Sequence, residues 1–100
     1  VEYLLAAYAG CLNVLCFMVA KEMGFALRGV RFEIEGSLNP DRLYARSFAE
    51  RAGFKEIRAK VFPDADADAT TLDAWLAAIK ERCPVGDNIG NATPIVLTVG

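Results

Sequence analysis

The longest apolar stretch of the chain lies at its start. Residues 3 to 20 contain a single polar amide, Asn13, among apolar or small neighbours. A segment that is apolar on every side is typical of a core helix. Lys21 and Gly24 supply the basic last turn and the glycine with which helices commonly end. We therefore expect a central apolar helix over residues 2–23.

The same stretch reaches the lower length limit of a transmembrane helix, since about 17 to 25 apolar residues cross a bilayer. Gly10 and Asn13 interrupt it, however, and amphipathic segments later in the chain need an apolar element to cover. We therefore expect a buried helix and no contact with a membrane. A membrane span or a signal segment is the alternative.

Two later segments alternate between apolar and charged residues with a period of 2, which indicates half-buried strands. The first is Val30 to Glu35, and the second runs from Glu56 to Val61. Their charged rows could pair across neighbouring antiparallel strands, and we interpret them as a solvated sheet face. A third apolar segment, Ile95 to Val99, predicts a final strand.

Residues 37–53, between the first two strands, have a less regular pattern. Tyr44, Phe48 and Ala52 are spaced four apart, which predicts either a short helix or an ordered insertion. The segment also carries three arginines, which form a solvated surface in the favoured interpretation and supply a cation to a thiolate in the other. They are Arg42, Arg46 and Arg51.

A second helix is predicted over residues 70–83. Thr70 with Asp73 three residues later matches a weak form of the capping box. An apolar stripe that begins at Leu72 continues to Cys83, eleven residues later, which is about three full helical turns. We therefore expect Cys83 to point inward with the core.

These elements follow the order helix, strand, insertion, strand, helix, strand. Pro84 ends the second helix, and a loop over residues 86–91 precedes the last strand. The order predicts an α+β fold in which a small antiparallel sheet carries two helices on one face. A length of 100 residues restricts the chain to a single domain, residues 1–100. The chain opens inside a predicted helix without an initiator methionine, so we expect the domain to be truncated at its N-terminus.

The amino-acid composition restricts the classes of function and partner that the protein can have. Hydrophobic residues make up 54% of the chain, more than a soluble monomer of this size needs, so we expect a dimer. A net charge of −2 gives no basic field for phosphate backbones, and nucleic acid is not an expected partner. Histidine is absent, which excludes Ser-His-Asp and Cys-His catalysis. Three cysteines without disulfide-framework spacing are typical of a cytoplasmic protein.

Cys11, in the middle of the first helix, and Cys83, at the end of the second, are expected to face each other. A second thiol within reach lets an oxidised sulfur end as a disulfide, which is the chemistry of a two-cysteine peroxidase. Cys16 cannot pair with Cys11, because five residues turn a helix by about 140°, and we interpret it as a packing residue. A zinc site would need a fourth ligand and closer spacings.

The segment Leu4-Leu-Ala-Ala-Tyr-Ala-Gly-Cys11, followed much later by Glu81-Arg-Cys83-Pro-Val, resembles the OsmC/Ohr family of osmotically inducible and organic hydroperoxide resistance proteins. The resemblance covers nearly the whole chain and includes Gly53-Phe54. It implies an intertwined homodimer with two sites at its interface, which reduces organic or fatty-acid hydroperoxides. By the same resemblance, Cys11 is the peroxidatic cysteine and Cys83 the resolving one.

The resemblance also implies partners for the thiols. In this family an arginine from the N-terminal region activates the reactive thiol, and we expect that arginine in the missing N-terminal segment. A family carboxylate upstream of the reactive thiol would fall near Glu2. Nine residues along one helix put Glu2 about 180° from Cys11, and an acid is also favourable at a helix N-terminus, so both roles stay open. The implied reductant is an external dithiol, possibly a lipoylated protein, and no bound cofactor or metal is expected.

The alternative function is a non-catalytic dimeric module of the same fold that binds a hydrophobic ligand between its subunits. A buried thiol without a cation nearby is inert, because burial raises its pKa. The presence of both Cys11 and Cys83 favours the enzyme.

Overall fold

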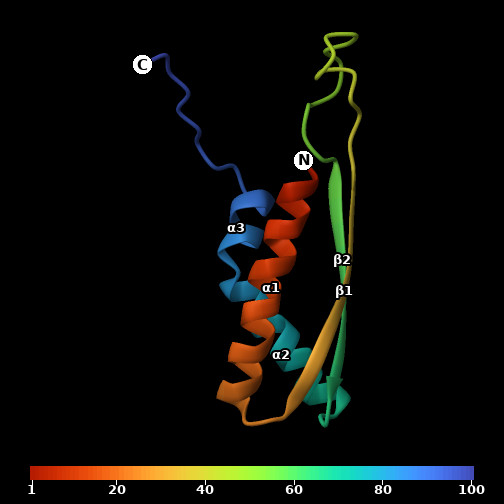
Figure 1. The fold of residues 1–100 in the computed structure, drawn as a ribbon, viewed down its shortest axis with the longest axis vertical. Coiled ribbons are helices and arrows are strands. Elements are labelled where there is room, and N and C mark those ends of the chain that lie inside the picture. The colour runs from red at the N-terminus through yellow and green to blue at the C-terminus, as the bar shows by residue number, and fades with distance from the viewer.

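The computed structural model describes residues 1–100 as an α+β fold. Two strands form an antiparallel hairpin, and the helices lie on one side of it (Figure 1). This arrangement confirms the predicted fold class. In chain order the elements are α1 (Glu2–Met23), β1 (Leu27–Ser37), β2 (Glu56–Ala65), α2 (Ala69–Arg82) and α3 (Pro84–Gly90).

Helix α1 has the bounds that the sequence predicts. Gly24 ends it in the left-handed conformation, with φ of 80°, and its N–H donates to the carbonyl oxygens of Ala20 and Lys21. One face of α1 forms most of the core together with α2. The core residues of α1 are Leu12, Leu15, Cys16, Val19 and Ala20.

By length and composition alone, α1 is also apolar enough to cross a membrane. Its packed face meets α2 and β1, as expected of a core helix. The opposite face leaves apolar side chains exposed, among them Val14, Phe17 and Met18. An all-apolar helix therefore has one covered face and one uncovered face in the single chain.

The hairpin register brings the predicted charge rows together. Glu33 lies opposite Lys60 and Glu35 opposite Arg58, and the guanidinium of Arg58 is 2.7 Å from the Glu35 carboxylate. These side chains are exposed, so the predicted solvated sheet face is confirmed. The strands are longer than predicted, because β2 continues through Pro63, which is tolerated at a sheet edge.

The predicted final strand over Ile95–Val99 is wrong. The segment carries no secondary structure and runs away from the body as an extended tail (Figure 1). Its apolar side chains are at least 86% exposed. Strand-forming residues need a neighbouring backbone to pair with, and this segment has none in the single chain.

Of the segment 37–53, Ser37 ends β1 and residues 38–53 form an ordered loop and not a helix. Turns occupy its first half, and Arg42 ties it together by donating to the backbone oxygens of Phe48 and Glu50. The predicted ordered insertion is therefore the correct alternative. Leu43, Tyr44 and Phe48 are exposed on it.

Two details of the second helix differ from the prediction. Asp68, and not Thr70, caps α2, because its carboxylate accepts a hydrogen bond of 2.8 Å from the N–H of Thr71. The predicted loop over residues 86–91 is also mostly wrong, since α3 occupies it up to Gly90. Pro84 at the first position of α3 explains the short helix, because its fixed φ suits a helix start.

Trp75 connects the two main helices. Its side chain is 2% exposed, and its indole N–H donates a hydrogen bond of 2.9 Å to the backbone oxygen of Cys16. Trp75→Phe should lower the free energy of unfolding by about 1 to 3 kcal/mol, because the hydrogen bond to Cys16 is lost and the smaller ring leaves space in the core. Urea denaturation measures this change. Leu97→Ala, in the exposed tail, is the control and should change stability by less than about 0.5 kcal/mol.

Candidate active site

The two cysteines that the sequence selects lie in contact. The sulfur atoms of Cys11, in α1, and Cys83, at the joint between α2 and α3, are 3.1 Å apart. The prediction that they face each other is therefore confirmed. A disulfide needs a separation of about 2.05 Å, so a shift of about 1 Å would close one. Both thiols are free in the structure.

The two thiols are not equivalent. Cys83 is 3% exposed, whereas Cys11 is half-buried and so more accessible. The pKa of Cys83 is raised, first by burial and then by the hydrogen bond that its thiol donates to the sulfur of Cys11. The N–H of Gly86 donates to the Cys83 sulfur at 3.3 Å and acts in the opposite direction. In this pair Cys83 is therefore the hydrogen-bond donor and Cys11 the acceptor.

Cys16 has the environment of a packing residue. It is fully buried in the core, and burial raises the pKa of its thiol to about 11. A thiol of this kind is almost entirely protonated at neutral pH and is a poor nucleophile. The structure therefore keeps Cys16 apart from the pair formed by Cys11 and Cys83.

Glu2 lies in the first turn of α1 and is exposed. Nine residues separate it from Cys11, which corresponds to about 13 Å along the helix axis. It makes no hydrogen bond or ion pair with the cysteine pair. Its position is that of an acid at a helix N-terminus, where negative charge is favourable. The structure does not bring Glu2 to the thiols.

Tyr8 is the neighbour of the cysteines that sequence reasoning missed. Its ring lies close to Gly86, where an added Cβ would be 3.3 Å from the ring and 3.5 Å from the Cys83 sulfur. Burial raises the pKa of the Tyr8 phenol, and the nearby Cys83 and Cys11 raise it further. The spacing of three residues between Tyr8 and Cys11 puts both on one helix face. That spacing is the feature of the sequence from which Tyr8 could have been predicted as a neighbour of Cys11.

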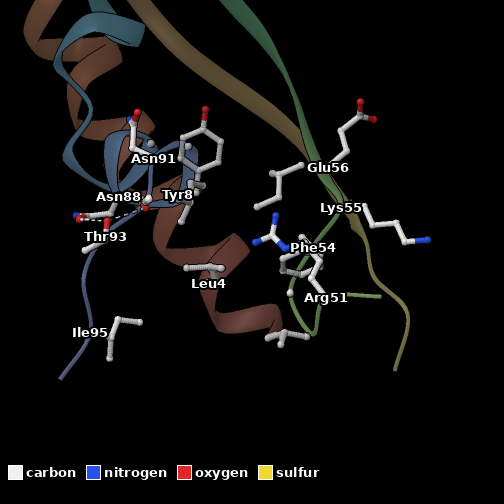
Figure 2. A pocket seen from close by; sticks show the side chains of 17 residues that line it. Leu4, Tyr8, Arg51, Phe54, Lys55, Glu56, Asn88, Asn91, Thr93 and Ile95 are labelled. Atoms are coloured by element: carbon white, nitrogen blue, oxygen red, sulfur yellow. Dashed lines mark hydrogen bonds between the residues drawn. The ribbon is translucent and has the colours of Figure 1, made fainter. Parts of the chain in front are cut away.

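A groove of about 730 Å³ opens beside Tyr8 (Figure 2). Arg51 also lines this groove, and we call it the Arg51 groove. Its walls come from the start of α1, from the end of the loop with the start of β2, and from α3 with the tail. The size is within the range of ligand pockets, about 300 to 1,000 Å³. Because Tyr8 lies in its wall, the groove leads towards the cysteine pair. Its apolar lining includes Leu4, Tyr8, Phe54, Ile57, Ile89 and Ile95.

A second groove of about 380 Å³ lies on the other side of Tyr8, between α2 and β2. Leu12, Trp75 and Val61 are among its mostly apolar lining residues. Tyr8 is therefore a wall shared by the two grooves, and it lies beside Gly86 and the Cys83 sulfur.

The three arginines of the loop have different surroundings. Arg42 is bound to backbone oxygens within the loop, and Arg46 lies 3.4 Å from Asp41. Both side chains belong to the surface of the loop, as expected from the interpretation of these arginines as a solvated surface. Arg51 instead lines the groove, and Figure 2 shows its guanidinium pointing into the cavity from beside Phe54. This placement gives the groove a cation.

This fold and a cysteine pair on facing helices define an OsmC-like protein. The model of the OsmC-like protein family matches residues 1–98, and the chain belongs to that family, which includes hydroperoxide reductases. Among solved structures the fold is similar to that of an OsmC like protein from Mycoplasma pneumoniae, with a TM-score of 0.76 and 16% sequence identity. The similarity covers 88% of this chain and 59% of that protein. No curated protein sequence matches the chain.

Proposed function

We propose that the chain is a thiol-dependent peroxidase that reduces organic or fatty-acid hydroperoxides. The observation that carries the proposal is the separation of 3.1 Å between the Cys11 and Cys83 sulfur atoms. Membership of a family that includes hydroperoxide reductases supports it. Both grooves reach Tyr8, the neighbour of the thiols, and the apolar side chains in their linings suit an organic hydroperoxide better than hydrogen peroxide.

In the proposed reaction, the Cys11 thiolate attacks one oxygen of the hydroperoxide and the O–O bond breaks. The organic fragment leaves with the electron pair, takes up a proton and departs as an alcohol, while Cys11 becomes a sulfenic acid. The Cys83 sulfur then attacks the sulfur of Cys11, and water leaves as the disulfide forms. An external dithiol, in the proposal a lipoylated protein, reduces the disulfide by thiol exchange and is itself oxidised.

The roles of the two thiols follow from their surroundings. In the contact between the two sulfurs, Cys83 donates the hydrogen bond and Cys11 accepts it. Cys11 is also the more exposed of the two, and a peroxide must reach the nucleophile. Cys83 needs only to reach Cys11, which it already contacts. These features support Cys11 as the peroxidatic and Cys83 as the resolving cysteine.

The proposal includes a cytoplasmic homodimer with no bound cofactor. A second copy is supported by the apolar side chains that the single chain leaves exposed on α1 and in the tail. Free thiols of this kind persist in a reducing compartment. The steps proposed above use the two thiols of this chain and an external dithiol.

The direct test treats the reduced protein with one equivalent of cumene hydroperoxide and follows its mass. We expect a rapid loss of two hydrogens, which peptide mapping places in a disulfide between Cys11 and Cys83, with Cys16 still free. In Cys83→Ser, Cys11 should stop at the sulfenic acid, react with dimedone and gain further oxygen with excess peroxide. If both thiols stay free while the peroxide persists, the non-catalytic module that binds a hydrophobic ligand becomes the function.

A further inference from the structure

We propose that the Arg51 groove binds long-chain amphiphiles by their carboxylate, and that Arg51 recognises this group. For the reaction, the consequence is selection of ionised fatty-acid hydroperoxides over their neutral esters. This second statement rests on the proposed peroxidase function, whereas carboxylate binding by the groove does not.

The first argument is the lack of a partner for Arg51. Arg28, Arg31, Arg46, Arg58 and Arg82 each form an ion pair with a carboxylate, and Arg42 donates to backbone oxygens. Arg51 alone among the arginines makes no hydrogen bond or ion pair. A guanidinium presents planar, paired donors that match a carboxylate. An unpaired guanidinium in a ligand-sized cavity is therefore suited to an anionic ligand.

The second argument is the character of the rest of the groove. Leu4, Phe54, Ile57 and Ile89 supply the apolar part of a lining that also contains polar residues, and burial of a hydrocarbon chain against apolar side chains is favourable. The groove thus combines the Arg51 guanidinium with a surface for an alkyl chain, which together match a long-chain carboxylate. Lys55 does not compete for this role, because its ammonium is 2.5 Å from the Glu50 carboxylate, and Figure 2 shows it pointing away from the cavity. Glu56 also lines the groove, but its carboxylate is 2.5 Å from the guanidinium of Arg58 and points away from the cavity in Figure 2.

The third argument is the position of the groove relative to the thiols. Tyr8 lines the groove and lies beside Gly86 and Cys83. A ligand held at Arg51 would therefore extend its chain along Tyr8, towards the cysteine pair. The carboxylate would be bound at a distance from the reacting sulfur, so Arg51 is a specificity-determining residue and not a catalytic one.

The first experiment measures binding without any peroxide. Isothermal titration of the reduced protein compares dodecanoate with dodecan-1-ol, which has the same chain length and no charge. We expect the wild type to bind dodecanoate about fivefold more tightly, as for a partly exposed ion pair. Arg51→Gln should lose this preference, and Arg46→Gln, a matched change in the same loop but outside the groove, should keep it. Equal binding of the two compounds, no binding of either, or a preference that survives Arg51→Gln would overturn the proposal.

The second experiment measures selection during turnover. The ratio of kcat/KM for a long-chain fatty-acid hydroperoxide to that for its methyl ester should fall about fivefold in Arg51→Gln and stay unchanged in Arg46→Gln. If kcat/KM fell equally for the acid and the ester, Arg51 would affect the reactivity of the thiols or the folding of the protein. That result would contradict the proposed selection of the carboxylate. If no hydroperoxide is consumed by any variant, the proposed peroxidase fails, while the dodecanoate titration still decides whether the groove binds carboxylates.

Discussion

Replacing Cys11 by serine should lower the rate of hydroperoxide consumption by at least about a thousandfold, because removal of a covalent nucleophile leaves only binding and orientation. A serine hydroxyl has a much higher pKa than a thiol and does not form a stable oxidised acid with peroxide. Stopped-flow measurement of hydroperoxide loss, with the protein in excess over the peroxide, reports this step without a reductant.

Cys16→Ala is the matched control for this prediction. Cys16 is fully buried in the core and its thiol pKa is about 11, so its loss should leave the oxidation rate within about twofold of the wild type. A Cys11→Ser protein that consumes hydroperoxide as fast as the wild type would show that another group reacts. Loss of the reaction in Cys16→Ala, in a protein that still folds, would point to Cys16.

Oxidation of the pair should raise the free energy of unfolding by about 4 kcal/mol relative to the reduced protein. Cys11 and Cys83 are 72 residues apart in the sequence, and a crosslink that closes a loop of this size restricts the unfolded chain strongly. The sulfur atoms are already in contact, so little of this gain is lost to rearrangement. Urea denaturation of the oxidised protein, compared with the same protein in excess dithiothreitol, measures the difference.

Cys83→Ser provides the control for the stability prediction, because it cannot form the disulfide. Its stability should be the same with and without dithiothreitol. An oxidised wild type that is no more stable than the reduced form would contradict the prediction. If oxidation does raise the free energy of unfolding, the disulfide would link Cys83, between α2 and α3, to α1. The reductant would then act on the more stable oxidised protein, whereas the peroxide acts on the less stable reduced protein.

The helix α1 and the hairpin could be predicted because their signals are local. Gly24 marks the end of α1 whatever surrounds it, since its left-handed conformation is costly for other residues. The period-2 alternation in β1 and β2 predicts which side chains share a face, whereas the register that places Glu35 opposite Arg58 comes from the structure. In each case the decisive interaction lies within the element or between neighbouring elements.

The local predictions that failed depend on choices that a sequence pattern leaves open. Asp68 and Thr70 are both suitable N-cap residues, and in the structure Asp68 caps α2. The segment from Pro84 to Gly90 has poor helix formers, yet it forms α3 against α1. The tail from Ile95 to Val99 has the composition of a strand and no strand beside it. Propensity describes what a segment can form, and tertiary contacts decide which form is adopted.

The sequence by itself determined the inventory of the candidate site and the direction in which Cys83 faces. The absence of histidine, the apolar helix that carries Cys11 and the stripe that ends at Cys83 are properties of the chain alone. Only the tertiary structure decided that the two sulfurs touch, that Tyr8 lies beside them and that Arg51 reaches the groove. The reason is physical: helical and strand periods fix orientation around one element, whereas a site joins segments whose separation along the chain carries no information about their distance in space.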